Sequence, residues 1–188
     1  MAIANMRGMT LFREARATDF PALQRIEQSA GRAFASIGMA AVAEDEPPSL
    51  ETLGAVRRAG HAWVAVDGDD RPLAYLLSAL VDGALHIEQV SVAPASARRG
   101  IGAALIDVVA SQAPSEVAFL TLTTFRDVPW NAPYYLRLGF TEIDPGALGE
   151  ELSRVVDHES RTIPGTAPRV TMRRPRDRPA TGSSDGVS

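Results

Sequence analysis

A short turn with two glycines, between an apolar stretch and an apolar helical segment, contains the residue types best suited to chemistry. Gly100 and Gly102 lack a Cβ, so the backbone there can turn tightly and come close to a ligand. The free N–H groups of a first helical turn point toward any anion in front of the helix. Arg98 and Arg99 add positive charge at the same end. We therefore predict a phosphate or other anion site here; a tight turn without a ligand is the simpler alternative.

The apolar stretch before this turn, residues 84–92, changes phase along its length. Apolar residues alternate before Glu88 as in a half-buried strand, but the next apolar pair, Val90 and Val92, comes one residue late. A β-bulge near Glu88 and Gln89 would cause this shift and would leave backbone groups without a partner on the neighbouring strand. Burial of the strand end on both faces would give the same pattern.

Strand and helix signals that would position these residues follow one another along the chain. Asp82 and Gly83 separate two strand signals and favour a tight hairpin turn. Segments 37–48 and 145–167 are expected to be irregular. The order fits an α/β or α+β fold in which helices pack on a mixed sheet. We expect strands at 10–17, 62–66, 72–81, 84–92, 116–123, 140–143 and 169–173, and helices starting near 18, 49, 100 and 133.

The chain of 188 residues is long enough for one domain with its own core. It contains no cysteine, which excludes disulfides, thiolate metal sites and a cysteine nucleophile. The net charge of −4 argues against a nucleic-acid partner, and no stretch of about 18 apolar residues could span a membrane. We expect a soluble, cytoplasmic protein with neither nucleic acid nor membrane as a partner.

The two ends of the chain differ in composition from its middle. Residues 1–9 are expected to form a flexible leader, and the domain is expected to occupy 10–174. Residues 175–188 are rich in proline, arginine, serine and glycine and should be disordered. The arginines at 173, 174, 176 and 178 would contact an acidic partner or, as the simpler alternative, belong to a charged disordered end.

A second motif lies downstream, where Asn131 precedes the run Tyr134 to Phe140, Tyr-Tyr-Leu-Arg-Leu-Gly-Phe. The glycine turn and this motif, in this order, resemble the GNAT superfamily of acetyl-CoA-dependent N-acetyltransferases. The resemblance covers 62–143 and implies a single domain with a mixed, mostly antiparallel sheet flanked by helices. It also implies acetyl-CoA as co-substrate, no metal, and a small-molecule or peptide amine as acceptor. Many members are homodimers, so a homodimer is among the expected assemblies.

The resemblance implies roles for the turn and for the strand before it. Backbone N–H groups of the turn would hold the pyrophosphate of coenzyme A, and the strand end would pair with the pantetheine amides. Asn131 would contact the pantetheine or cap the helix that follows it. The implied cofactor-binding residues are Val90, Ser91, Val92, Arg98, Arg99, Gly100, Ile101, Gly102, Ala103 and Asn131.

The turn departs from the family pattern at two positions. Ala97 stands where a glutamine or arginine is usual, and Arg98 replaces a common glycine. Because most phosphate contacts in such a turn come from the main chain, we expect cofactor binding to survive. Arg98 or Arg99 would supply the missing side-chain contact.

Tyr135 lies four residues before Gly139, where the resemblance places the tyrosine that protonates the departing thiolate. A phenol with a pKa of about 10 can donate to a thiolate of comparable basicity. Tyr134 is the neighbouring alternative, but adjacent helical positions face different ways, and we expect it to pack into the core. A purely structural wedge against the sheet is the other interpretation of Tyr135.

An amine acceptor must lose a proton before or during its attack on the thioester. Glu88, at the suspected bulge, is the first candidate for the general base, acting directly or through water. Some family members use a glutamate on the next strand, but the corresponding residue here is Thr123, which cannot serve. His86 is a weaker candidate for the base. His61 and His158 lack the spacing of metal ligands, so no metal site is predicted.

Other classes of nucleotide site fit the turn poorly. A Rossmann fingerprint needs a third glycine where Leu105 stands, and a P-loop needs a lysine where Ala103 follows Gly102. A non-catalytic acyl-CoA sensor on the same fold is the alternative to an enzyme, and the two candidates for proton transfer favour the enzyme. Residues that select the acceptor would lie in 33–48 and 145–167. Acidic residues there would attract a cationic amine, although solvated surface is the commoner role of such charges.

Overall fold

The structure is a computed structural model that describes residues 3–5, 10–162 and 167–177. The expected leader and tail therefore lie partly outside the described residues, which omit 1–2, 6–9 and 178–188. The described strands are β1 Ile3–Asn5, β2 Thr10–Glu14, β3 Ala62–Val66, β4 Pro72–Val81, β5 Ala84–Val92, β6 Phe119–Phe125, β7 Thr141–Glu142 and β8 Arg169–Pro175. The described α-helices are α1 Phe20–Ala35, α2 Ala40–Ala43, α3 Leu50–Arg58, α4 Ile101–Gln112, α5 Ala132–Arg137 and α6 Glu150–Thr162.

These strands form one eight-stranded sheet in the order β1-β2-β3-β4-β5-β6-β8-β7. β5 and β6 run parallel, and the other described pairs are antiparallel. This confirms the expected fold class, a mixed and mostly antiparallel sheet flanked by helices. None of the helices in the described part of the chain has the length and apolar character needed to cross a bilayer.

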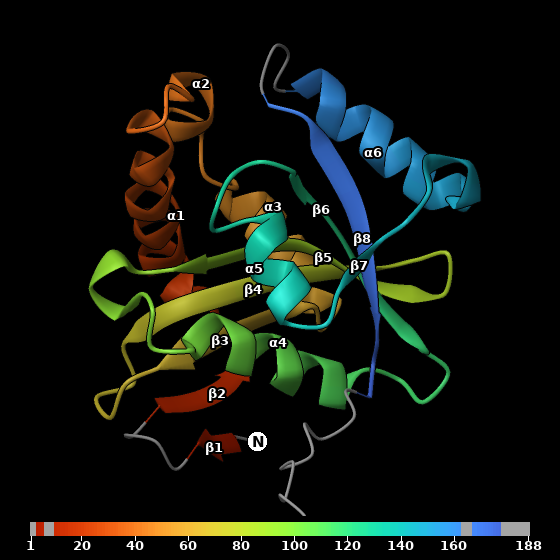
Figure 1. The fold of residues 1–188 in the computed structure, drawn as a ribbon. Helices are drawn as coiled ribbons and strands as arrows, with labels where there is room; N and C mark the ends of the chain where they lie inside the picture. Colours follow the sequence, from red (N-terminus) through yellow and green to blue (C-terminus); the bar gives the residue numbers. More distant parts are fainter. Residues whose placement is uncertain (1–2, 6–9, 163–166, 178–188) are drawn as a thin grey trace, which may run out of the picture.

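Helices cover both faces of the sheet (Figure 1). On one face α4 buries Ile101, Leu105 and Ile106 against the sheet, in a core that also contains Phe140 after α5. On the other face α1 and α3 pack against a second core. The residues of α1 and α3 in this second core are Phe20, Leu23, Ile26 and Leu53. Burial of an apolar residue of this size contributes about 1.5–3 kcal/mol, so each helix is held by its apolar face.

β5 contains the predicted bulge. Gln89 pairs with Leu77 of β4 and Ile87 pairs with Ser78, so Glu88 has no partner on β4. The extra residue restores the pattern, because apolar residues before and after Glu88 pack against the same core. These residues are Leu85, Ile87, Val90 and Val92.

The predicted hairpin turn is also present. Asp82 and Gly83 have φ angles of 47° and 73°, which is the left-handed pair that a two-residue turn between twisted strands requires. The Asp82 carboxylate then accepts hydrogen bonds from the N–H groups of Glu151 at 3.2 Å and Leu152 at 2.9 Å, at the start of α6. The turn therefore caps a helix that lies far away in sequence.

Several expectations for the ends and irregular segments were wrong. Residues 3–5 of the expected leader form β1, which pairs with β2. Segment 145–167 contains α6, whose Leu152 is buried, and 37–48 contains the short α2. The start of α6 is capped by Asp82 in the distant hairpin turn, so the sequence around α6 does not reveal this cap.

Arg174 does not belong to a charged, solvated end, because β8 continues beyond the expected strand 169–173 to Pro175. The Arg174 side chain is buried and donates to the carbonyl of Leu138 at 3.1 Å and to Asp107 of α4 at 2.5 Å. It also lies over the ring of Phe140, with the guanidinium carbon 5.2 Å from the ring centroid. Composition predicts a charged tail, but pairing with β6 and these partners bring the arginine into the core.

Candidate active site

A cavity of about 1240 Å³ opens where β5 and β6 separate. The parallel pairing of the two strands ends at Ile87 and Leu122. Beyond this point the cavity is lined by the end of β5, the end of β6, the first turn of α4, and parts of α1 and α5. Residues far apart in sequence therefore lie together where β5 no longer pairs with β6.

The backbone of β5 faces this opening. The N–H of Ala93 donates to the carbonyl of Leu73, near the start of β4, with an N···O distance of 2.8 Å. Because the bonding direction alternates along a strand, the N–H groups of Val90 and Val92 point away from β4 and toward the opening. Val90, Ser91 and Val92 all line the cavity. Extended ligands with amide groups could therefore add to the strand edge here.

The turn before α4 presents its backbone to the same cavity. Arg98 and Gly100 have φ angles of 60° and 77°, so two residues of the turn adopt the left-handed conformation. A Cβ built on Gly100 would meet no atom within 4 Å, which leaves open space in front of the helix. Arg98, Gly100, Ile101, Gly102 and Ala103 line the cavity. Arg99 is absent from the lining, so it is the one predicted member of the turn that the structure does not bring to the cavity.

Asn131 also lines the cavity, but its side chain does not cap α5. Its Nδ2 donates to Oγ1 of Thr124 on β6 at 2.8 Å. Its backbone carbonyl accepts from the N–H groups of Tyr134 and Tyr135, at 2.8 and 3.0 Å. Asn131 therefore fixes the start of α5 to the end of β6, and the side-chain capping alternative was wrong.

Tyr134 and Tyr135 are neighbours in the cavity wall, with ring centroids 5.3 Å apart. The Tyr135 ring also packs edge-on against Phe140 at 5.6 Å. Burial raises the pKa of both phenols, and Tyr134 adds to the effect on Tyr135. Both hydroxyl groups therefore keep their proton at neutral pH. Tyr134 packs against the core, as expected, but it also lines the cavity, and its hydroxyl lies 3.4 Å from the Cβ position of Gly102.

Glu88, the bulge residue, projects into the cavity wall and remains exposed. Partial removal from bulk water raises the pKa of its carboxyl group, and the nearby charge of His61 opposes this in part. A carboxylate with a raised pKa is a better proton acceptor near neutral pH than an ordinary one. The bulge thus places a basic group beside the backbone amides of β5.

A comparison of the sequence with protein families matches residues 21–140 to the acetyltransferase (GNAT) family. The chain belongs to the GNAT family. This membership supports an acyltransferase that uses acetyl-CoA.

Solved structures share this fold at low sequence identity. A GNAT-family acetyltransferase from Staphylococcus aureus Mu50 is 15% identical, with a TM-score of 0.68 over 89% of this chain and 99% of that one. A Mycobacterium tuberculosis protein in complex with CoA is 22% identical, with a TM-score of 0.63 over 86% and 96%. The ribosomal-protein-S18-alanine N-acetyltransferase from Escherichia coli is 20% identical, with a TM-score of 0.59 over 92% and 97%.

The alternative bases of this GNAT domain are placed differently from Glu88. His86 is 1% exposed and does not line the cavity. Its Nδ1 lies 3.0 Å from Oγ1 of Thr121, and burial lowers its pKa to about 4. Thr123 lines the cavity, but its hydroxyl is buried and makes no hydrogen bond within the described residues. Of Glu88, His86 and Thr123, only Glu88 both lines the cavity and has a side chain that can accept a proton there.

Glu27 of α1 is a cavity residue of this GNAT domain that sequence reasoning missed. Its carboxylate accepts hydrogen bonds from Tyr75 at 2.5 Å, Gln89 at 2.9 Å and Ser91 at 2.7 Å. The Ser91 hydroxyl therefore donates to Glu27 on α1, while the Ser91 backbone is part of β5. This network ties α1 to β5 directly after the bulge. No spacing in the sequence connects a glutamate at 27 with a strand at 89–91.

Three aromatic residues, Phe34, Phe125 and Trp130, also line the cavity and were missed. Phe34 comes from α1, Phe125 ends β6, and Trp130 lies between β6 and α5. The Phe34 centroid is 5.7 Å from the Phe125 centroid and 5.7 Å from the Trp130 centroid. We call these three residues the aromatic wall. Its members come from segments that only the fold brings together.

Proposed function

We propose that the protein transfers an acetyl group from acetyl-CoA to the nitrogen of a primary amine by direct attack. The observation that carries this proposal is the opening between β5 and β6, where backbone amides, the start of α4 and Glu88 share one cavity. The chain has no cysteine, so an acyl-cysteine intermediate is excluded. Direct transfer needs one base and one acid near the reacting carbon, and the cavity contains a candidate for each.

The residues around the opening fit coenzyme A. The outward N–H groups of Val90 and Val92 match the amides of an extended pantetheine arm. The left-handed turn at Arg98 and Gly100 leaves space for phosphate in front of the α4 N-terminus, whose free N–H groups favour an anion. Acetyl-CoA would supply an activated acyl carbon held against the end of β5.

Glu88 would accept a proton from the acceptor ammonium, directly or through one water. Its raised pKa brings its basicity closer to that of the group it must deprotonate, which increases the efficiency of proton transfer. The amine nitrogen would then form its bond to the acyl carbon as the carbon–sulfur bond breaks.

Tyr135 would donate its phenolic proton to the departing thiolate sulfur. Its raised pKa keeps the proton in place until negative charge develops on the sulfur. The contact with Phe140 holds the ring in one orientation, so the donor need not be ordered during the reaction. In all, the nitrogen loses two protons, one to Glu88 before the attack and one to water as the amide forms, and the sulfur gains one from Tyr135. Glu88 then releases its proton to solvent and Tyr135 regains one from solvent.

Tyr135→Phe tests the acid, with Tyr134→Phe as the matched control. General acid catalysis contributes about 10²–10⁴-fold, so Tyr135→Phe should lower kcat by at least 100-fold. The KM for acetyl-CoA should change less than about threefold, because the ring and its packing are retained. Release of free CoA thiol over a panel of amines gives both constants. Tyr134→Phe should keep kcat within about threefold; the opposite ranking of the two variants would overturn the assignment.

Glu88→Gln tests the base. The wild-type rate should rise with pH as the Glu88 carboxyl group, whose pKa is raised, loses its proton. The variant should lose this limb of the pH profile and retain acetyl-CoA binding by calorimetry. An unchanged profile would remove Glu88 from the mechanism. Binding of acetyl-CoA without turnover of any amine would favour a non-catalytic acyl-CoA sensor.

A further inference from the structure

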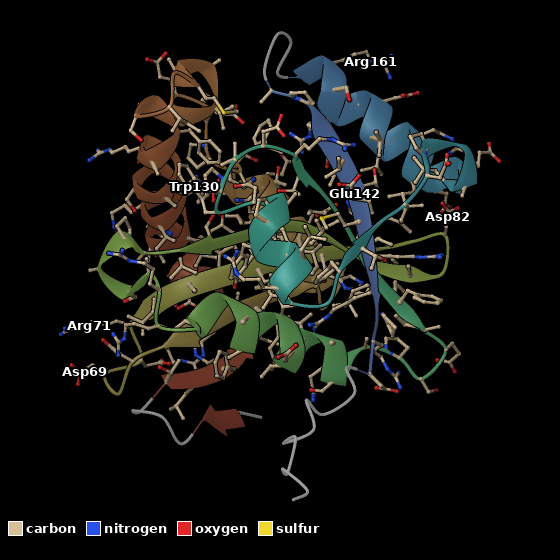
Figure 2. All side chains as sticks on the ribbon, in the orientation of Figure 1. Asp69, Arg71, Asp82, Trp130, Glu142 and Arg161 are labelled. Carbon is tan, nitrogen blue, oxygen red and sulfur yellow. The ribbon has the colours of Figure 1, made fainter. Side chains whose placement is uncertain are left out.

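The aromatic wall comes from α1, the end of β6 and the segment before α5, and none of its members belongs to α4 or to the turn before it. Figure 2 shows Trp130 near α1, where its ring contacts Phe34. The Trp130 side chain is 41% exposed although it lines the cavity. An exposed indole in a concave site leaves apolar area available to a ligand. A bound coenzyme at β5 and α4 would leave this part of the cavity for the acceptor.

Outside the turn before α4 and outside α5, acidic residues outnumber arginines among the residues that line the cavity. Asp45 and Glu46, which follow α2, line the cavity together with the catalytic candidate Glu88. Arg32 of α1 is a cation among these lining residues. The balance favours a positively charged acceptor, because opposite charges in a partly desolvated cleft attract more strongly than in water.

Arg169 of β8 is the second of these arginines, and it already has partners. Its Nη2 donates to Glu159 of α6 at 2.8 Å, and both side chains are at least three-quarters buried. Its guanidinium carbon lies 4.9 Å from the centroid of Phe125. The pair with Glu159 offsets the charge of Arg169 through Nη2 and keeps the guanidinium against Phe125, while its Nε is buried and has no hydrogen-bond partner in the described residues. A carboxylate on the acceptor would have to compete with Glu159 for this arginine.

We propose that the acceptor is a cationic primary amine that carries an aromatic ring and has no carboxylate beside the amine. The proposal rests on the proposed acetyl transfer and names the substrate class of that site. The ring of such an arylalkylamine packs on the aromatic wall, while its ammonium group lies toward Glu88. A single aromatic pair contributes about 0.5–1.5 kcal/mol beyond the burial of area, so one ring of the wall accounts for up to about tenfold in affinity.

Three amines separate the features of this proposal. 2-Phenylethylamine has the ring and the charge, butylamine lacks the ring, and phenylalanine adds a carboxylate. We expect kcat/KM for 2-phenylethylamine to exceed that of the other two by at least tenfold, measured by release of CoA thiol. A preference for butylamine or phenylalanine would overturn the proposal while acetyl transfer still stood.

Trp130→Ala tests whether the aromatic wall is responsible for the preference for an amine with a ring. It should lower kcat/KM for 2-phenylethylamine about tenfold and that for butylamine less than twofold. Phe119→Ala is the matched control, because Phe119 is also 41% exposed but does not line the cavity. It should leave both amines unaffected. An equal loss for the two amines in Trp130→Ala would mean that Trp130 supports the fold of the site and does not recognise a ring.

Tryptophan fluorescence separates failure of the acceptor proposal from failure of acetyl transfer. The chain has two tryptophans, and Trp63 is 7% exposed, so Trp130 is the one that a ligand in the cavity can reach. Saturable quenching by 2-phenylethylamine, lost in Trp130→Phe, would support the acceptor site even without turnover. Turnover of other amines with no quenching by 2-phenylethylamine would overturn the acceptor proposal alone.

Discussion

Acid should destabilise this protein through His86, a buried residue that sequence reasoning left as an alternative base. Its side chain is 1% exposed, and Nε2 is buried without a hydrogen-bond partner in the described residues. Nδ1 lies 3.0 Å from Oγ1 of Thr121. A second proton on this ring would create a buried charge with no carboxylate partner. Burial therefore lowers the pKa of His86 to about 4 from an ordinary value of 6.5.

The direction and size of the effect follow from linkage. The folded state favours neutral His86, whereas the unfolded chain binds a proton below pH 6.5. The contribution of neutral His86 to the free energy of unfolding is therefore fully present above pH 6.5 and is lost as the pH falls toward 4. A shift of about 2.5 units at 1.36 kcal/mol per unit gives a loss of about 3 kcal/mol, within a typical total of about 5–15 kcal/mol.

Urea unfolding of wild type and His86→Asn between pH 4 and 8 measures this loss. The asparagine retains a polar atom near Thr121 but has no proton to gain. The wild type should lose about 3 kcal/mol more than the variant over this range, and the difference should be constant above pH 7. A difference that does not vary with pH would refute the reasoning. A changed pH profile of kcat in the variant would return His86 to the list of candidate bases.

Two further variants test local geometry. Arg98→Gly should raise the free energy of unfolding by about 1 kcal/mol in urea, because Arg98 has a φ of 60° that costs a residue with a Cβ about 1–2 kcal/mol. It should also weaken acetyl-CoA binding severalfold at low salt, as measured by calorimetry; unchanged affinity would exclude a role for this charge. Gly149→Ala should cost about 1 kcal/mol, because a Cβ there would collide with the Asp82 carboxylate that caps α6. Asp82→Ala should cost a similar amount, and strictly additive losses in the double variant would contradict a shared cap.

The sequence predicts the parts of the site that depend on local pattern. The shift in apolar phase around Glu88 identifies the bulge, because strand periodicity is a property of neighbouring residues. The glycines at 100 and 102 identify the helix start for the same reason. Asp82 and Gly83 identify the hairpin turn through their tolerance of positive φ.

Residues whose role depends on a distant partner were not predicted. Glu27 meets β5 only when α1 packs on the sheet, and the aromatic wall assembles from three segments. The turn that caps α6 gives no signal within 145–167, but the helix itself has an apolar stripe at Leu152, Val155 and Val156 that its periodicity could have revealed. Arg174 looks like part of a solvated tail until β8 pairs with β6 and places it beside Asp107. For Glu27, the aromatic wall and Arg174, a tertiary contact outweighs the local composition.

The separation of β5 from β6 affects how far this sequence can vary. An opening that offers N–H groups of the main chain makes the same contacts whatever side chains the strand carries, provided that the strand persists. Selection on such a contact acts on backbone shape and leaves most positions along the strand free to change. Related chains can therefore diverge greatly in sequence without losing the opening, whereas an acceptor site of the kind proposed, built from side chains, would have to change for a different amine.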